Sequence, residues 1–326
     1  MKVRKKIFKI LKVLFSAVIL ILIVGVAWNG ICSRMEHKKL DNVYGKQMEV
    51  DGNLMTVEVL NQSTQGEPIV LLPGWGSASP VLEFKPLAEQ LSKEYTVITI
   101  EPFGYGLSDG TDRVRSIENI TEELRECVRQ LGYEEYYLMG HSISGLYSLY
   151  WANAYPEEVQ GVIGIDPSVP HMTDKENEPF PISTISINKL TAYAGKAMNV
   201  TGLARLLSAG RPENAVYADF SYPYSEEELE TFRLLSIDCA YNKTVMNEMD
   251  CLKENLAALA DYKFPEGIPV LEFISKKNCD MMPAWEKLHE DTLKEDDEML
   301  ILDGSHYLHF EQRDEIVSET FRWLRE

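Results

Sequence analysis

The stretch YYLMGHSISG, residues 136–145, joins an apolar run to a serine that is surrounded by small residues. The first half has the composition of a buried strand, and in the second half Gly140 and Ser144 flank Ser142. Small residues two places before and after a serine let the chain turn sharply from strand to helix, which exposes the hydroxyl. A serine hydroxyl is a weak nucleophile, so it needs such a fixed position beside a base. The stretch therefore predicts a nucleophilic Ser142.

Strands and helices alternate on both sides of this stretch. The continuous apolar run at residues 68–76 is typical of a strand buried on both faces, residues 268–275 are expected to form another strand, and residues 116–133 have the spacing of an amphipathic helix. Residues 46–60 alternate apolar and polar side chains around Asp51-Gly52, which is typical of a β-hairpin. The pattern predicts an α/β fold in which a mostly parallel central sheet, opened by an antiparallel hairpin, carries helices on both faces.

The alternation is interrupted from about residue 170 to 264, where helical patches and an aromatic run replace it. We therefore expect an N-terminal membrane anchor over residues 1–35, a first core part over 36–169, a helical cap insertion over 170–264 and a second core part over 265–326. Several cap residues are expected either to line an apolar pocket or to form the cap's own core: Met198, Leu206, Leu207, Tyr217, Phe220, Tyr222 and Tyr224.

The N-terminal region is basic and contains a long apolar run. Residues 1–40 contain nine Lys or Arg and one acidic residue, Glu36, while the rest of the chain contains 23 basic and 50 acidic residues. As a helix, residues 10–31 would be about 33 Å long, which is enough for a bilayer core of roughly 30 Å. We expect an uncleaved single-pass anchor with a cytoplasmic N-terminus and an extracytoplasmic body. The alternatives are a cleaved signal peptide and a buried helix of a soluble protein.

Composition also excludes some kinds of partner. The acidic body argues against nucleic acid as a partner. The five cysteines lack the spacing of a metal site, and we expect most of them to be buried, although Cys239 and Cys251 are close enough in sequence to pair. No motif indicates a metal or an organic cofactor.

The order and spacing of these motifs resemble the α/β-hydrolase family over residues 46–326, apart from the insertion. The family's nucleophile turn usually reads Gly-x-Ser-x-Gly, and here Ser144 stands at the last glycine with Gly145 one place on. Serine is small enough for that turn. The resemblance implies a parallel sheet with Ser142 at its carboxyl edge and a catalytic acid and histidine later in the chain.

The family order of serine, acid and histidine implies the other two catalytic residues. His306 follows the apolar stretch 298–303 in a segment similar to the family's final loop, and His309 is its nearest rival. The acid follows the penultimate strand in the family, which implies Asp280. This loop lacks the usual glycine three residues before the acid and is longer, so Asp166, the position that some relatives use, is the alternative.

The resemblance also implies two backbone donors for the tetrahedral oxyanion. One is the N–H of Ile143, the residue after the nucleophile. The other is the N–H of Trp75 in the loop Leu72-Pro73-Gly74-Trp75-Gly76, where Pro73 replaces the usual histidine. Glu101, at the family's aspartate position after the fourth strand, is expected to be a structural hydrogen bonder.

Together these features predict a membrane-anchored serine hydrolase that cleaves carboxylic esters of small-molecule acyl substrates through an acyl-enzyme. Dehalogenases and epoxide hydrolases of this family attack with aspartate, whereas this chain has Ser142. The alternatives are an aminopeptidase or acyltransferase on the same fold and, of another class, a tethered binding protein without activity. The acidic segment 225–230 would favour the aminopeptidase if it faced the cleft.

Overall fold

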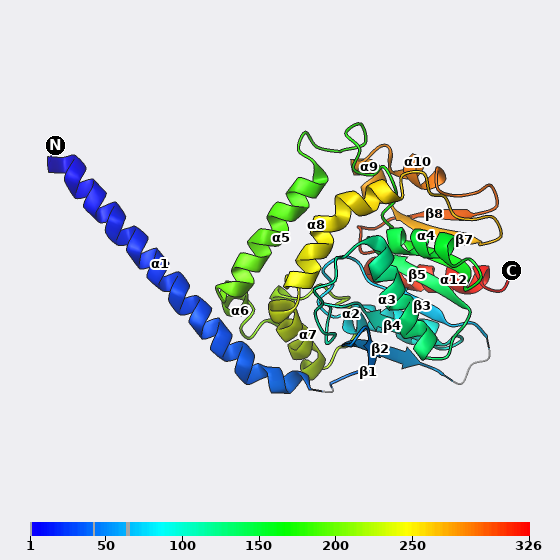
Figure 1. Ribbon diagram of the computed structural model, residues 1–326, viewed down its shortest axis with the longest axis horizontal. Helices are drawn as coiled ribbons and strands as arrows, with labels where there is room; N and C mark the ends of the chain where they lie inside the picture. Colours follow the sequence, from blue (N-terminus) through cyan, green and yellow to red (C-terminus); the bar gives the residue numbers. More distant parts are fainter. Residues whose placement is uncertain (1, 42, 63–65) are drawn as a thin grey trace.

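An eight-stranded sheet forms the centre of the body in the computed structural model, which describes residues 2–41, 43–62 and 66–326 (Figure 1). The strands lie in the order β1-β2-β4-β3-β5-β6-β7-β8. The pairs β1/β2 and β2/β4 are antiparallel and the other pairs are parallel, which confirms the predicted mostly parallel sheet. The strands are β1 Lys46–Val50, β2 Asn53–Leu60, β3 Ile69–Leu72, β4 Val97–Glu101, β5 Tyr136–His141, β6 Val159–Ile165, β7 Val270–Ser275 and β8 Glu298–Leu302.

The predicted hairpin is formed by β1 and β2. Val50 pairs with Asn53 across a two-residue turn, in which Asp51 and Gly52 both have positive φ, at 50° and 75°. Two consecutive residues of this kind make the turn whose twist matches that of the flanking strands. The Asp-Gly pair therefore fixes the register with which the sheet begins.

The helices α3 Ile117–Gln130 and α4 Ser144–Ala154 cover one face of the sheet, and α2 Pro80–Leu91 and α12 Arg313–Trp323 cover the other. The further helices of the described residues are α1 Lys2–Glu36, α5 Thr184–Val200, α6 Leu203–Leu207, α7 Glu226–Asp238, α8 Lys243–Ala258, α9 Lys276–Met281, α10 Trp285–Glu290 and α11 Leu308–Glu311, with 3-10 turns at His37–Leu40 and Pro212–Asn214. In β3, Val70 and Leu72 pack toward α3 and α4, while Ile69 and Leu71 pack toward α2 and α12. This two-sided burial explains why the strand is apolar throughout.

The helices α5 to α8 lie between β6 and β7, where the sequence predicts the cap, and we use that name for residues 170–264. The acidic start of α7 has a local structural role. The side chain of Ser225 accepts a hydrogen bond from the backbone N–H of Glu228, and the Glu228 carboxylate accepts one from the N–H of Ser225. This reciprocal pair is a capping box that stabilises the first turn of the helix.

The N-terminal helix α1 extends away from the body (Figure 1). Among the described residues it is the one helix that is long and apolar enough to cross a bilayer, and its most apolar window is not buried against the rest of the chain. A membrane anchor and a signal sequence share these properties.

The five cysteines are unpaired in the structure, so Cys239 and Cys251 do not form a disulfide. Cys127 is buried among apolar side chains, as expected for most of the cysteines, and this burial raises its thiol pKa to about 12. The other four are only partly buried, so the expectation that most of the cysteines are buried is wrong.

Glu101 is a fully buried hydrogen-bond acceptor at the end of β4. Its carboxylate accepts hydrogen bonds from the Tyr44 hydroxyl at 2.9 Å, the Ser79 hydroxyl at 3.2 Å and the Leu107 N–H at 2.7 Å. It thereby connects β4 to the start of α2 and to the following turn, the structural role that the sequence predicts. Burial raises the carboxyl pKa from 4.5 to about 7, although the hydrogen bonds from Leu107 and Tyr44 oppose that shift.

This raised pKa predicts a pH-dependent contribution to stability. Because the folded state holds the proton more tightly than the unfolded state, the stabilisation is complete below pH 4.5 and is lost as pH rises to about 7. The free energy of unfolding of the wild type, relative to that of Glu101→Gln, should fall by about 3 kcal/mol over this range, at about 1.4 kcal/mol per pH unit. Urea unfolding of both proteins in detergent measures this difference, and a difference independent of pH would contradict the assignment.

Candidate active site

Ser142 occupies a sharp turn between β5 and α4. Its φ is +54°, a conformation that non-glycine residues rarely adopt. A side chain at Gly140 would come within about 3.0 Å of the Ser144 carbonyl, and one at Gly145 would lie 2.4 Å from Pro167. The two glycines therefore permit the close packing that the turn requires, as the sequence predicts.

The unusual serine of the motif, Ser144, also stabilises the turn. Ser144 is buried, and its hydroxyl donates a hydrogen bond to the carbonyl of Pro73. That contact ties the start of α4 to the loop in which Trp75 lies. A glycine at position 144 could not make this hydrogen bond, so the departure from the family motif adds an interaction rather than removing one.

His306 comes from the loop after β8 and lies beside Ser142. Its Nε2 is 2.8 Å from the Ser142 Oγ, although 164 residues separate the two in sequence. Its backbone carbonyl accepts a hydrogen bond from the Nε2 of His141 at 3.0 Å. The structure thus brings together the predicted nucleophile and the predicted base.

The carboxylate beside His306 belongs to Asp166 and not to Asp280. The Oδ2 of Asp166 is 2.6 Å from the His306 Nδ1, and Asp166 is fully buried. Its Oδ1 accepts hydrogen bonds from the Ser275 N–H at 2.8 Å and from the Trp285 indole at 3.1 Å, and its Oδ2 accepts another from the Asn278 side chain. A buried carboxylate with this many donors has its charge compensated by hydrogen bonds.

The prediction that Asp280 is the carboxylate beside His306 is wrong, and the local structure explains why. The loop that would carry it is the short helix α9, which begins immediately after β7 and is capped by the Ser275 hydroxyl, an acceptor for the Asn278 N–H. Asp280 lies on the outer side of this helix with a side chain that is 66% exposed, and it pairs with Lys276 at 2.7 Å. The helix brings Asn278, a residue that the sequence reading missed, toward Asp166. The sequence did contain an indication, because Asp166 directly follows β6 and α9 lacks the family's glycine.

The residues predicted to supply oxyanion donors, Trp75 and Ile143, both border the cavity above Ser142. A side chain at Gly74 would come within 3.2 Å of the Ser142 Cβ, so the loop backbone passes directly beside the nucleophile. The Trp75 indole donates to the Val245 carbonyl of α8 at 3.0 Å, which anchors this loop to the cap.

A cavity of about 610 Å³ lies between the sheet edge and the cap, and Ser142 and His306 form part of its wall. Its lining is mainly apolar. The sequence allowed two roles for Met198, Leu207 and Tyr217, as pocket lining or as the cap's own core. All three are among the lining residues. The acidic segment 225–230 is not among the lining residues, and Glu83 is the one acidic side chain that the described residues contribute to the wall.

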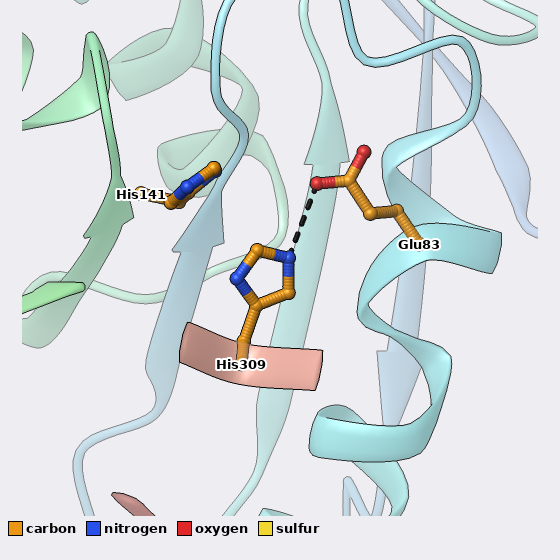
Figure 2. Close-up of side chains that lie close together, drawn as sticks. All are labelled: Glu83, His141 and His309. Carbon is orange, nitrogen blue, oxygen red and sulfur yellow. Dashed lines mark hydrogen bonds and ion pairs between the residues drawn. The ribbon is translucent and has the colours of Figure 1, made fainter. Parts of the chain in front are cut away.

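Glu83, His141 and His309 form a buried polar cluster beside this cavity (Figure 2). His309, the rival to His306, donates from Nε2 to the Glu83 carboxylate at 3.3 Å, and Ser77 donates to the same carboxylate. Burial lowers the pKa of His141, and the neighbouring His309 and His306 lower it further, so its ring is neutral at neutral pH. The hydrogen bonds therefore explain His309 as a partner of Glu83 and not of Ser142.

The same cluster contains the described residues best suited to hold a metal ion. Glu83, His141 and His309 each present one ligand atom, and these atoms lie within 4.8 Å of one another. The Nδ1 atoms of both histidines have no hydrogen-bond partner among the described residues. Neither histidine replaces His306 beside Ser142, since His141 donates to the His306 carbonyl and His309 to Glu83.

Comparisons with known proteins agree with the fold. A family model described as alpha/beta hydrolase fold matches residues 67–183. The uncharacterised protein YbdG of Bacillus subtilis (strain 168) is 26% identical over 270 residues, which cover 82% of this chain and 80% of that protein. A soluble epoxide hydrolase of Corynebacterium sp. (strain C12) is 25% identical over 232 residues, which cover 69% of this chain and 80% of the relative.

A solved structure is similar over most of the chain. The esterase EaEST from Exiguobacterium antarcticum superimposes with a TM-score of 0.60 at 18% identity, and the match covers 87% of this chain and 100% of the esterase. At this identity the likeness concerns the fold alone.

Substitution of Asp166 or Asp280 tests which carboxylate acts on His306, with the rate at which a fluorophosphonate labels Ser142 as the measurement. In Asp166→Asn, the amide cannot hold the His306 ring in the tautomer that accepts a proton from Ser142, so we expect labelling to slow by about 10³- to 10⁴-fold. In the matched control Asp280→Asn, the rate should stay within about twofold, because Asp280 faces solvent. Mass spectrometry of intact protein over time measures both rates, and the opposite ranking would restore Asp280.

Proposed function

Because the chain belongs to the α/β-hydrolase fold family, we propose that it hydrolyses carboxylic esters through a triad of Ser142, His306 and Asp166. The observation that carries this proposal is the continuous hydrogen-bond path from Ser142 Oγ to His306 Nε2 at 2.8 Å and from His306 Nδ1 to Asp166 at 2.6 Å. A nucleophile, a base and a group that orients the base are the elements that acyl transfer requires.

The proposed order of proton transfers follows from the hydrogen bonds of the two His306 ring nitrogens. Asp166 accepts the Nδ1–H of His306, which leaves the Nε2 lone pair directed at the Ser142 hydroxyl. As Ser142 Oγ attacks the ester carbonyl, its proton passes to Nε2, and the imidazolium then gives that proton to the departing alcohol. Water repeats the sequence on the acyl-enzyme and releases the carboxylic acid.

The developing oxyanion needs hydrogen-bond donors, for which we propose the backbone N–H groups of Trp75 and Ile143. Ile143 is the residue immediately before α4, where free N–H groups and the helix dipole favour negative charge. Trp75 lies in a loop held by hydrogen bonds to Ser144, at the start of α4, and to Val245 of the cap. Fixed donors of this kind are typically worth about 10²- to 10³-fold in rate each.

The lining of the cavity favours an ester with an apolar acyl group as the substrate, rather than a substrate with a free amine. Its wall is mainly apolar, and Glu83 already accepts hydrogen bonds from Ser77 and His309. An aminopeptidase would need an unpaired carboxylate for the substrate ammonium group, and the acidic segment 225–230 is not among the lining residues. An epoxide hydrolase of this family would need aspartate in place of Ser142.

We also propose that α1 anchors the enzyme in a membrane, with the N-terminus in the cytoplasm and the body on the other side. The apolar window of α1 is exposed, as expected for a helix whose partner is lipid. Basic residues precede the span, whereas the body is acidic, which is the charge asymmetry that sets this orientation.

Ser142→Ala should remove turnover of p-nitrophenyl esters while leaving the fold intact. The matched control is Ser148→Ala in α4, because the Ser148 hydroxyl is buried and has no hydrogen-bond partner among the described residues. We expect at least a 10³-fold loss in kcat for the first variant and less than a twofold change for the second.

The same assay ranks the substrate classes. Butyrate to dodecanoate esters should be cleaved faster than aminoacyl p-nitroanilides, because the wall is mainly apolar and the Glu83 carboxylate already accepts hydrogen bonds from Ser77 and His309. Faster cleavage of the anilides would favour the aminopeptidase, and undiminished turnover by Ser142→Ala would contradict the proposed nucleophile.

A further inference from the structure

We propose that the corner between α5 and α6 is seated in the membrane and delivers acyl substrates from the lipid phase to Ser142. This inference rests on the anchored ester hydrolase proposed above and adds the route by which its substrate arrives. It is carried by three features of the cap: its contact with α1, a buried polar cluster beside that contact, and an apolar face continuous with the wall of the cavity.

The cap contacts α1 inside the stretch expected to span the bilayer. A side chain at Gly25 would lie 2.4 Å from the carbonyl oxygen of Thr201, so glycine is required where the two backbones cross. A side chain at Gly202 would come within 3.1 Å of the Trp28 ring. Gly25 is six residues before Ile31, where the apolar span ends, which corresponds to a depth of about 9 Å along the helix. Interfacial helices bury their apolar faces by about 5–10 Å, so this depth is that of the boundary between head groups and acyl chains.

A buried polar cluster fixes the cap against α1 near the end of this span. The guanidinium of Arg205 in α6 donates to the Asn29 side chain at 2.9 Å and to the Ser33 hydroxyl at 3.0 Å, and it pairs with Glu36. Ser33 in turn donates to Asp238 of α7 at 2.7 Å. Arg205 is buried by these contacts, and its charge is compensated by the carboxylate of Glu36, so no unpaired charge faces lipid. The cluster holds α6 at a fixed position along α1.

The outer side of α5 and α6 is apolar and exposed, and Figure 1 shows α5 lying between α1 and α8. Leu190 is 73% exposed and Leu206 is 63% exposed. Residues 180–209 contain no Asp or Glu, although the chain has 51 acidic residues in 326, so seating this part of an acidic body in the membrane places no carboxylate of the segment in lipid. We call the following residues the apolar face of the cap: Ile187, Leu190, Tyr193, Val200, Leu203, Leu206 and Leu207.

This face is continuous with the cavity. Leu207 is 53% exposed and also lines the cavity, and the partly exposed Met198 does the same. The inner side of α5 contributes Thr191, Ala192 and Gly195 to the wall. In this arrangement α5 lies between the lipid and the cavity that contains Ser142. The acyl chain of a substrate that enters at the corner of α5 and α6 would move from an apolar phase into an apolar cavity. A second copy of this chain is the competing occupant of such a face, but lipid is favoured because the face adjoins the predicted span.

The first test uses the full chain reconstituted into phosphatidylcholine vesicles that contain 30% phosphatidylglycerol and a phospholipid with a diazirine in its acyl chain. After irradiation, mass spectrometry should find lipid adducts on peptides from α1 and on peptides covering residues 187–207, with none on α12. Adducts on α1 without adducts on 187–207 would overturn the seated cap and leave the anchor intact. An unlabelled α1 would overturn the anchor and the seated cap together. If 187–207 is unlabelled and light scattering gives a dimer, the second copy is the occupant.

The second test separates delivery from chemistry. The double variant Leu190→Glu with Leu206→Glu places charges on the apolar face, and Val114→Glu with Ile301→Glu is the matched control on exposed apolar positions elsewhere. We expect the first variant to lose at least tenfold in hydrolysis of p-nitrophenyl palmitate dissolved in the vesicles and less than twofold on soluble p-nitrophenyl acetate. The control should match the wild type on both esters. Equal losses on both esters, or no loss on the palmitate, would overturn the proposal, whereas failure of the wild type to cleave acetate would count against the hydrolase itself.

Discussion

The site depends on hydrogen bonds that join the turn at Ser142 to the turn after β6. The carbonyl of Ser142 accepts from the N–H of Ser168 at 2.7 Å, and the Ser142 N–H donates to the carbonyl of Ile165 at 3.2 Å. Both Ser142 and Asp166 have positive φ, so each turn is in a conformation that costs energy and needs support. Because the two turns support each other, Ser142 and Asp166 are held at fixed positions, and the side chain of His306 contacts both.

We propose that the cap and α1 extend this site toward lipid. Trp75 connects the loop beside the nucleophile to α8, and α5 and α6 connect the cap to α1. The chain is thus organised from a preorganised polar centre through an apolar cavity to an apolar outer face. Such an arrangement suits a substrate that is itself apolar at one end and carries the reactive carbonyl at the other.

Much of the fold was predictable because its determinants are local. The continuous apolar run of β3, the Asp-Gly turn after β1 and the small residues around Ser142 each specify their own structure. The carboxylate that contacts His306 was harder to predict because its identity depends on how the chain leaves β7. There Ser275 caps α9 and turns Asp280 toward solvent, while Asn278 and Trp285 surround Asp166. The contacts that expose Asp280 are local, but those that bring Asn278, Trp285 and His306 to Asp166 join side chains more than 100 residues apart, and sequence spacing does not encode them.

The most direct test of the central claim is a crystal structure of the protein after reaction with a phosphonate ester. The account predicts phosphorus bonded to Ser142 Oγ, with a phosphonyl oxygen about 2.7–3.1 Å from the backbone nitrogens of Trp75 and Ile143. It also predicts that Asp166 stays on the Nδ1 of His306. An adduct on another residue, or Asp280 in contact with His306, would contradict it.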